Sequence, residues 1–317
     1  MLLAAARLAT GRRSMKLFSS SFTLLGAAIS MRMESHLPPE KLQRYPVLSN
    51  TQVSPDSHLL RVGFAGRDYL GFEADIPTCI AVNFNGTSES GEPALLKKSY
   101  SPISHPNQEN TFDLLVKAYP ERPGGGVGAY LCSLQEGDYI EGKVKSQRIM
   151  HKSPAVLDRW TDVGMVAGGT GIAPLYQIVQ ILLRDADEST ETNSIPRIHV
   201  LSINRMEQDI LLKKEMDRLA ERYPDRFRVT YALTGEKKEG YHYGRGGVEL
   251  AKTALPDPSQ EKVMVLVCGK DGFVKTWGGP IGRAPPLPDG ARGPKIQGPL
   301  LGLLKEAGFD ASQVFKY

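Results

Sequence analysis

The chain is poor in cysteine and in long apolar runs. Its 317 residues include three cysteines, Cys79, Cys132 and Cys268, and six histidines without ligand spacing. Few, widely spaced cysteines argue against a disulfide framework and a cysteine metal site, and they favour a reducing compartment. We therefore expect no metal. The apolar run 22–30 is far shorter than the roughly 20 residues that a membrane-spanning helix needs.

A strong charge of either sign is also missing. The formal net charge is +4 and the hydrophobic content is 41%. This excess of base is too weak to indicate a nucleic-acid partner, but it is compatible with an acidic protein or an anionic membrane surface. The length is sufficient for two domains.

Acidic residues are absent from the first 33 positions, which are basic and rich in serine. Arg7, Arg12, Arg13 and Lys16 precede the first acid, Glu34. This composition is typical of a mitochondrial presequence, although a disordered tail or a short signal anchor has similar features. We predict a targeting presequence and linker over 1–43, a mitochondrial protein, and membrane association, if any, through this segment only.

Two patterns follow the linker. Residues 44–155 contain short strands separated by glycine and proline turns, including Asn85-Gly86, which predicts an antiparallel β-barrel. Residues 160–317 alternate buried strands with helical runs, which predicts a parallel-sheet α/β domain. The expected helices span 173–184, 209–222, 248–254 and about 298–307. The stretch 277–298 is expected to be a surface loop.

The strongest local signal is the segment 164–175, Gly-Met-Val-Ala-Gly-Gly-Thr-Gly-Ile-Ala-Pro-Leu. It reads as a buried strand, a glycine turn and a helix start at Pro174. Glycines let the backbone approach a pyrophosphate, and the helix N-terminus supplies free N–H donors. A nucleotide site is one interpretation, and a tight turn without a ligand is the other.

Two further segments favour the nucleotide interpretation. Lys98-Ser99-Tyr100-Ser101 combines a cation, an aromatic ring and hydroxyls, a set that can hold a flavin. Cys268-Gly269 ends another buried strand far along the chain. With the glycine turn, in this order, the chain resembles the ferredoxin–NADP reductase-like flavoproteins, and within them the mitochondrial type of NADH–cytochrome b5 reductase. The resemblance covers about 44–317 and extends to 115–119, 204–212, 297–304 and 313–317.

The resemblance implies an FAD-binding β-barrel followed by an NAD(P)H-binding α/β domain. It also implies an enzyme that moves a hydride from NADH to FAD and passes single electrons to a haem protein, with cytochrome b5 as the expected acceptor. Ser101 near the flavin and Cys268 near the nicotinamide are the expected catalytic residues. The expected cofactor-binding residues are Lys98, Ser99, Tyr100, Ser101, Leu115, Val116, Lys117, Tyr119, Gly125, Gly126, Val127, Gly128, Gly168, Gly169, Thr170, Gly171, Ala173, Pro174, Asp209, Cys268 and Gly269.

The chain departs from the family pattern at several of these positions. Lys98 stands where the family has an arginine. Lysine offers one compact charge, whereas arginine offers a two-pronged fork. Gly128 and Ala173 replace hydroxyl residues, and Lys270 replaces a proline. Asp209 matches an acid associated with a preference for NADH, or it is simply a helix N-terminal acid.

Two other interpretations stay open. One is an NADPH-dependent ferredoxin or flavodoxin reductase or another diaphorase, because Arg205 offers a charge for a 2′-phosphate. The other is a degenerate, non-enzymatic member that binds flavin weakly, since fold alone does not secure function.

Overall fold

The computed structural model describes residues 41–64, 79–88, 90–105, 108–119, 126–145, 160–188, 196–288, 290 and 293–317, with backbone only over 184–188. The chain divides into two units, 1–36 and 37–317, and every described residue belongs to the second. The predicted presequence up to residue 40 lies outside the described residues. Among the helices that are described, none has the length and apolarity needed to cross a membrane.

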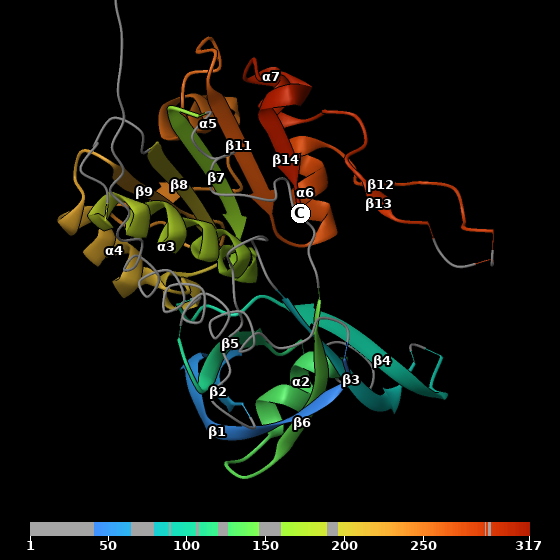
Figure 1. The fold of residues 1–317 in the computed structure, drawn as a ribbon. Helices are drawn as coiled ribbons and strands as arrows, with labels where there is room; N and C mark the ends of the chain where they lie inside the picture. The colour runs from blue at the N-terminus through green and yellow to red at the C-terminus, as the bar shows by residue number, and fades with distance from the viewer. Residues whose placement is uncertain are drawn as a thin grey trace, which may run out of the picture. The chain divides into compact units, whose positions relative to one another are not determined.

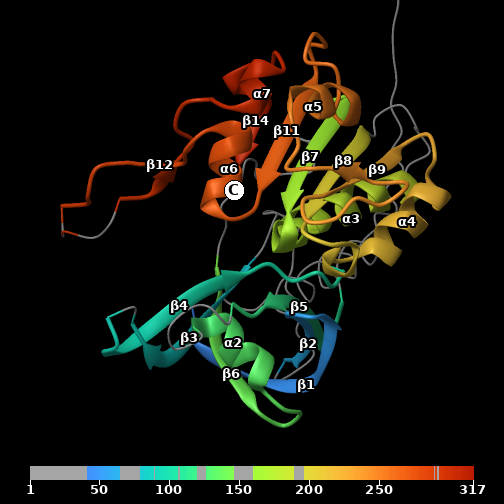
Figure 2. The same cartoon turned by 180° about the vertical axis from the view of Figure 1, so that it is seen from behind.

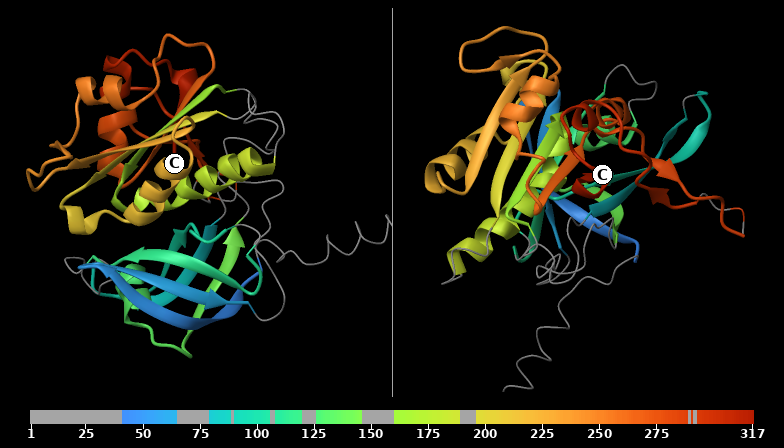
Figure 3. Two further views of the ribbon diagram at one scale, coloured as in Figure 1. Left: turned by 90° about the vertical axis from the view of Figure 1, so that its left-hand side faces the viewer. Right: turned by 90° about the horizontal axis from the view of Figure 1, so that it is seen from above.

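The N-terminal part is a curled antiparallel sheet of six strands (Figures 1 and 3). The strand order is β4-β3-β6-β1-β2-β5. The strands are β1 (Gln43–Ser54), β2 (Ser57–Gly63), β3 (Cys79–Thr87), β4 (Pro93–Tyr100), β5 (Thr111–Lys117) and β6 (Tyr139–Lys145). The expected turn at Asn85-Gly86 is wrong, because both residues pair with β4 inside β3 and the chain turns at 88–91 instead.

A hydrophobic core fills the concave side of this sheet. Leu60, Ile80 and Phe112 are fully buried in it. Helix α2 (Gly126–Ser133) adds Val127 and Leu131 to the same cluster. This helix was not predicted, because its glycines have poor helix propensity. Burial of Val127 and Leu131 outweighs that preference.

The C-terminal part is a parallel sheet of six strands. Its strand order is β10-β9-β8-β7-β11-β14, and every neighbouring pair is parallel. The strands are β7 (Asp162–Gly168), β8 (Arg197–Asn204), β9 (Phe227–Leu233), β10 (His242–Tyr243), β11 (Val263–Cys268) and β14 (Val314–Lys316). The two-part fold class predicted from the sequence is confirmed, because the antiparallel sheet precedes the parallel one.

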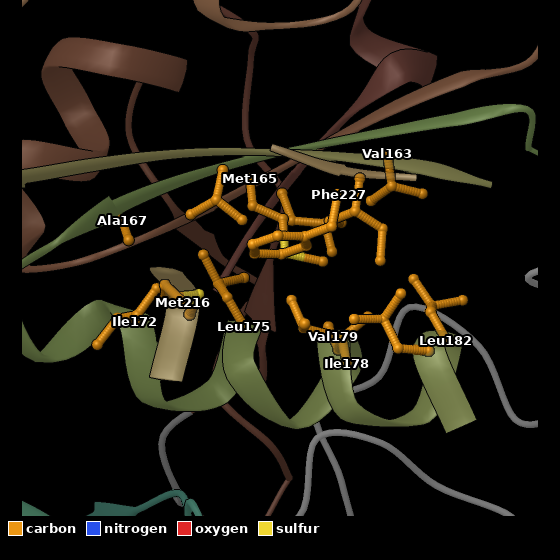
Figure 4. Close-up of a cluster of buried hydrophobic side chains, with 14 of the residues drawn as sticks. Val163, Met165, Ala167, Ile172, Leu175, Ile178, Val179, Leu182, Met216 and Phe227 are labelled. Carbon is orange, nitrogen blue, oxygen red and sulfur yellow. The ribbon is translucent and has the colours of Figure 1, made fainter. Parts of the chain in front are cut away.

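Helices cover both faces of the parallel sheet (Figures 1 and 2). One face carries α3 (Ile172–Glu188) and α4 (Lys213–Arg222), and the other carries α5 (Val248–Ala254), α6 (Asp271–Gly278) and α7 (Leu303–Glu306). Figure 4 shows side chains of β7 pointing at one side of α3. The facing residues are Val163, Met165 and Ala167 on β7 and Ile172, Leu175, Ile178 and Val179 on α3.

Several boundaries differ from the sequence-based expectation. The helix expected from Asp209 begins at Lys213, after Leu212 adopts a left-handed φ of 58°. Helix α6, which follows Cys268-Gly269, was not among the expected helices, and the final helix is shorter than expected. The stretch 277–298 includes the end of α6 and a small hairpin of β12 (Gly282–Arg283) and β13 (Lys295–Ile296).

Lys316 anchors the base of this hairpin to β14. Its side chain is 4% exposed, and its Nζ donates to the carbonyl oxygens of Pro280, Gly298 and Pro299 at 3.1, 3.3 and 2.9 Å. Gln297 also exchanges two hydrogen bonds with the Lys316 backbone. Burial lowers the pKa of this ammonium, but three carbonyl partners compensate for its lost hydration.

Candidate functional site

Two neighbouring cavities contain most of the predicted site residues. The first, here called the strand-end cavity, has a volume of about 570 Å³ and lies at the carboxyl ends of the parallel strands. The second, the tyrosine cavity, has a volume of about 310 Å³ and includes residues of β4 and β5. Lys117, Tyr119, Thr170 and Lys270 line both cavities, so the two spaces adjoin.

The tyrosine cavity brings together segments that are far apart in the sequence. It joins the Lys98–Ser101 segment, the glycine turn and the Cys268 segment, as the predicted site requires. The predicted residues that line it are Lys98, Ser99, Tyr100, Ser101, Leu115, Lys117, Tyr119, Thr170, Gly171, Ala173, Pro174, Cys268 and Gly269. Cys79, Lys270, Asp271 and Lys295 also line it and were not predicted as site residues, and Tyr317 lines it from the C-terminal segment that resembles the family.

Cations and aromatic rings alternate in this cavity. The Nζ of Lys98 lies 5.4 Å from the ring centre of Tyr100 and 5.0 Å from that of Tyr119. The Nζ of Lys270 lies 4.1 Å from the ring of Tyr119 on the border with the strand-end cavity. Together with the hydroxyls of Ser99 and Ser101, these groups offer stacking surfaces, donors and positive charge. Such a donor set fits a flat, polar ring that carries phosphate.

Lys117 is held by an ion pair on the wall shared by the two cavities. Its Nζ lies 2.5 Å from Oδ2 of Asp56. Burial raises the pKa of Asp56, but Lys117, Ser57 and Ser54 stabilise the carboxylate more, so its pKa falls below the ordinary value. The ammonium of Lys117 is therefore fixed in place and partly neutralised, unlike a mobile surface lysine.

The glycine turn connects the two cavities. Gly168, Gly169 and Thr170 line the strand-end cavity, while Thr170 and Gly171 line the tyrosine cavity. A short 3-10 turn over Gly169–Gly171 leads directly into α3, which has 17 residues. A nucleotide diphosphate beside this turn would face the free N–H groups of a long helix.

Close packing explains why Gly171 has no side chain. A Cβ there would overlap the backbone carbonyl of Cys268. The glycine turn therefore lies directly against the end of β11. This contact places Cys268 and Gly171 in the wall of one cavity.

Tyr317 lies beside Cys268 in the tyrosine cavity. Its backbone N–H donates to the carbonyl of Val267 at 3.0 Å, which continues the pairing of β14 with β11. Burial raises the pKa of the Tyr317 phenol, and the Cys268 thiol raises it further. The phenol therefore stays neutral at physiological pH. A neutral aromatic ring can cover the flat face of a ligand.

Four predicted residues line neither of these cavities. Val116 is fully buried in the core of the antiparallel sheet, and Val127 packs into that core from α2. Gly126 and Gly128 are buried at the start of α2. Gly125, which completes that segment, lies outside the described residues.

Asp209 has a structural partner within its own turn. It lines the strand-end cavity, but its Oδ2 accepts a hydrogen bond of 3.1 Å from the backbone N–H of Met206. This is the capping interaction of the 3-10 turn Glu207–Asp209. The alternative interpretation, an acid that stabilises a helix start, therefore describes this geometry.

Several residues of the strand-end cavity were missed by the sequence analysis. They are Ile203, Asn204, Thr234, Arg245, Gly272, Phe273, Thr276 and Trp277. Asn204 and Thr234 end or directly follow buried strands, and this position is a usable signal in α/β folds. Arg245 follows a strand of two residues and has no comparable signal. Among the described residues, no cluster of three or more His, Cys, Asp or Glu could hold a metal ion.

Two domain families match the two parts of the chain. Residues 44–149 match the oxidoreductase FAD-binding domain, and residues 165–277 match the oxidoreductase NAD-binding domain. These ranges contain the curled sheet and most of the parallel sheet, respectively. The FAD-binding range holds Lys98–Ser101, and the NAD-binding range holds the glycine turn and Cys268.

Solved structures with the same fold include a cytochrome b5 reductase domain and the CS-b5R domains of another protein. The cytochrome b5 reductase domain of Ulva prolifera nitrate reductase superposes with a TM-score of 0.65 at 22% identity, covering 89% of this chain and 98% of that domain. The CS-b5R domains of human Ncb5or give a TM-score of 0.62 at 18% identity, covering 87% of this chain and 69% of theirs. At these identities the likeness establishes the fold.

Sequence relatives are more similar. NADH-cytochrome b5 reductase 2 of Coccidioides immitis (strain RS) is 36% identical over 222 residues, which cover 69% of this chain and 61% of the relative. The chain thus spans less than two thirds of the length of that protein. NADH-cytochrome b5 reductase 2 of Aspergillus clavatus is 33% identical over 267 residues, which cover 84% of this chain and 74% of the relative. With this extent of shared sequence, the chain belongs to the NADH–cytochrome b5 reductase family.

Proposed function

We propose that the protein is a flavoprotein reductase that transfers a hydride from NADH to FAD and passes single electrons to a haem protein such as cytochrome b5. The observation that carries this proposal is the shared wall of the two cavities at Lys117, Tyr119, Thr170 and Lys270. Two flat ring systems bound in adjoining cavities can meet face to face. Hydride transfer requires such contact and needs no acid–base pair from the protein.

The tyrosine cavity is the proposed flavin site. Lys98 supplies positive charge for the diphosphate, and Tyr100 and Tyr119 supply aromatic surfaces. Ser101 supplies a hydroxyl for a polar edge of the flavin ring. Ala173 and Pro174, at the start of α3, complete the wall with apolar surface. The chain therefore binds and orients the flavin, and FAD supplies the redox chemistry when bound.

The strand-end cavity is the proposed NADH site. Its diphosphate would lie beside Gly168–Gly171 at the start of α3, and its nicotinamide would extend toward Cys268 at the end of β11. Gly171 packs against Cys268, so this path is short and leads into the tyrosine cavity. Cys268 orients the nicotinamide in this proposal and does not act as a nucleophile.

The proposed acceptor follows from the names of the relatives and from charge. Both relatives described above are NADH-cytochrome b5 reductases. Among the described residues that line the tyrosine cavity, Lys98, Lys117, Lys270 and Lys295 carry basic side chains, and Asp271 carries the one acidic side chain. A cavity with this excess of positive charge attracts an acidic electron carrier and accelerates its encounter, most strongly at low salt.

Visible absorbance of the purified chain tests the proposal. We expect flavin bands that bleach when NADH is added without oxygen and return when oxidised cytochrome b5 follows. Lys98→Met should weaken FAD binding about tenfold, the cost of one charge-assisted hydrogen bond. Lys97→Met is the matched control, because Lys97 is exposed on the opposite face of β4. A protein without flavin bands even after FAD is added would refute the proposal and favour a non-enzymatic role.

A mitochondrial location is part of the proposal and rests on the composition of the N-terminus. Five basic residues, Arg7, Arg12, Arg13, Lys16 and Arg32, precede the first acid, as in import sequences. Residues 1–43 fused to a fluorescent protein should direct it to mitochondria. Replacing Arg7, Arg12, Arg13 and Lys16 by glutamine should leave it in the cytosol. A fusion that stays cytosolic without these replacements would contradict this part.

A further inference from the structure

Two exposed arginines line the strand-end cavity without an acidic partner. Arg205 directly follows β8, and Arg245 follows β10 by two residues. Neither forms an ion pair within the part of the chain that the structure describes. Lysines nearby are engaged, because Lys213 pairs with Asp217 and Lys238 pairs with Glu207. The two guanidinium groups are therefore available for a ligand.

Carboxylates at this edge of the sheet already have protein partners. Asp209 accepts the Met206 backbone N–H, and Glu236 accepts that of Glu207. Glu207 also accepts hydrogen bonds from Lys238 and Tyr241, which lower its pKa. The oxygens of these three acids are therefore directed at protein donors. The unpaired charge that faces the cavity here is positive.

Strand order places the arginines at one end of a bound dinucleotide. The glycine turn follows β7, and Cys268 ends β11 on one side of β7. The strands β8, β9 and β10 lie in order on the other side. If the diphosphate lies at the turn and the nicotinamide at Cys268, as proposed above, the adenosine extends toward β8–β10. Its ribose then reaches Arg205 and Arg245.

We propose that these two arginines form a site for the 2′-phosphate of NADPH, so that the protein uses NADPH as well as NADH. Guanidinium groups bind phosphate through paired hydrogen bonds, which makes arginine the preferred residue for this purpose. An arginine near the ribose is also how dinucleotide-binding folds accommodate a 2′-phosphate. Asp209, turned to the Met206 N–H, opposes the phosphate less than a free carboxylate would. The inference rests on the proposed function, because it assumes that the strand-end cavity binds the coenzyme.

Calorimetric titration of the FAD-loaded protein with two fragments tests the site without relying on turnover. The fragments are 5′-AMP and 2′,5′-ADP, which differ only by the 2′-phosphate. We expect 2′,5′-ADP to bind the unmodified protein at least tenfold more tightly, with an affinity that falls steeply as salt is added. Arg205→Gln and Arg245→Gln should each reduce the ratio of the two affinities about tenfold. Arg218→Gln, on the exposed side of α4, is the matched control and should leave the ratio unchanged.

The outcomes separate this inference from the proposed function. Equal affinities for the two fragments, or an unchanged ratio in both arginine variants, would overturn the 2′-phosphate site while leaving an NADH site intact. No binding of either fragment would overturn the coenzyme site itself. Steady-state turnover provides a second readout, because the ratio of kcat/KM for NADPH to that for NADH should fall in parallel with the affinity ratio.

Discussion

Gln177 on α3 donates a buried hydrogen bond of 2.6 Å to the carbonyl oxygen of Pro102, directly after the Lys98–Ser101 segment. One turn along the helix, Gln180 donates to Ile103 at 2.8 Å. The helix that begins at the glycine turn is therefore bonded to the segment that lines the tyrosine cavity. These two glutamines fix the relative position of the proposed flavin and coenzyme sites.

Loss of this contact should destabilise the protein. Gln177→Leu leaves the buried Pro102 carbonyl without this donor, which costs about 1–3 kcal/mol. The urea midpoint should fall accordingly, and bound FAD should dissociate at a lower temperature. Gln260→Leu, at an exposed position, is the control and should change neither value. Equal midpoints for the two variants would contradict a role for Gln177 in joining the two sites.

Acid should weaken the fold through His199. This half-buried ring contacts Oδ1 of Asp162 at 3.0 Å, while Arg197 binds the same carboxylate at 2.8 Å. Burial and the charge of Arg228 lower the pKa of His199 below its ordinary 6.5, despite the neighbouring Asp162. The unfolded chain therefore takes up a proton first as the pH falls through 6.5. The contribution of neutral His199 to the free energy of unfolding is fully present above that pH. As the pH falls further, the free energy of unfolding decreases by up to about 1.4 kcal/mol per pH unit until the pKa of His199 in the folded protein is reached.

His199→Gln removes this titration and keeps a donor for Asp162. The free energy of unfolding, measured in urea from pH 7.5 to 5, should become flatter than that of the unmodified protein. His242→Gln, at an exposed position, should retain the original slope. A second loss of folding stability remains in both variants at lower pH. It arises because the pKa of Asp162 is lowered in the folded protein, and the stability that this gives is lost only as the pH falls below 3.8. Parallel curves for all three proteins down to pH 5 would exclude His199 as the cause.

Serine at position 128, where the resemblance implies a hydroxyl residue, should harm the protein. Gly128 is buried, and a Cβ there would overlap the carbonyl of Lys117. Gly128→Ser therefore forces α2 away from β5 and costs about 1–3 kcal/mol, as overpacking generally does. Thermal unfolding and FAD content should both fall. Ala129→Ser, at the half-buried next position, should be nearly neutral, and tighter FAD binding by Gly128→Ser would show that a hydroxyl is all this site lacks.

A methyl group at Gly171 should disturb both cavities. It would overlap the Cys268 carbonyl and push the glycine turn away from β11. Misplacement of a reacting group by about 1 Å can cost a hundredfold in rate, so kcat/KM for NADH should fall at least tenfold in Gly171→Ala. Gly247→Ala is the control, because a Cβ there meets no atom within 4 Å. Unchanged kinetics would mean that the turn does not position the coenzyme.

The sequence predicted the parallel sheet best, because strands buried on both faces are unbroken apolar runs. Val263–Cys268 and Asp162–Gly168 are such strands. Cys268 at the end of the first and Thr170 and Gly171 after the second meet in the tyrosine cavity. Two helices were missed. Helix α2 begins at Gly126, and α6 begins at Asp271 within Lys270-Asp271-Gly272, and at both places local propensity indicates a turn. Tertiary burial, which no local pattern reports, decides both.

The site was harder to predict where side chains alternate or strands are very short. Leu115 and Lys117 line the tyrosine cavity, while Val116 between them enters the opposite core, as the pleat of β5 requires. The prediction of Val116 as a site residue together with Leu115 and Lys117 ignored that period. Arg245 follows a two-residue strand whose position depends entirely on pairing with β9. Its place in the cavity depends on long-range contacts, which a single sequence does not reveal.

The three carbonyls bound by Lys316 have a consequence for the C-terminal end of the described chain. The base of the 280–299 hairpin receives its buried ammonium from β14, which lies at the edge of the parallel sheet and pairs with β11. Lys295 on the hairpin and Tyr317 beside β14 both line the tyrosine cavity. Detaching β14 from β11 would therefore loosen the hairpin and open the tyrosine cavity together, so that one edge strand controls the integrity of both.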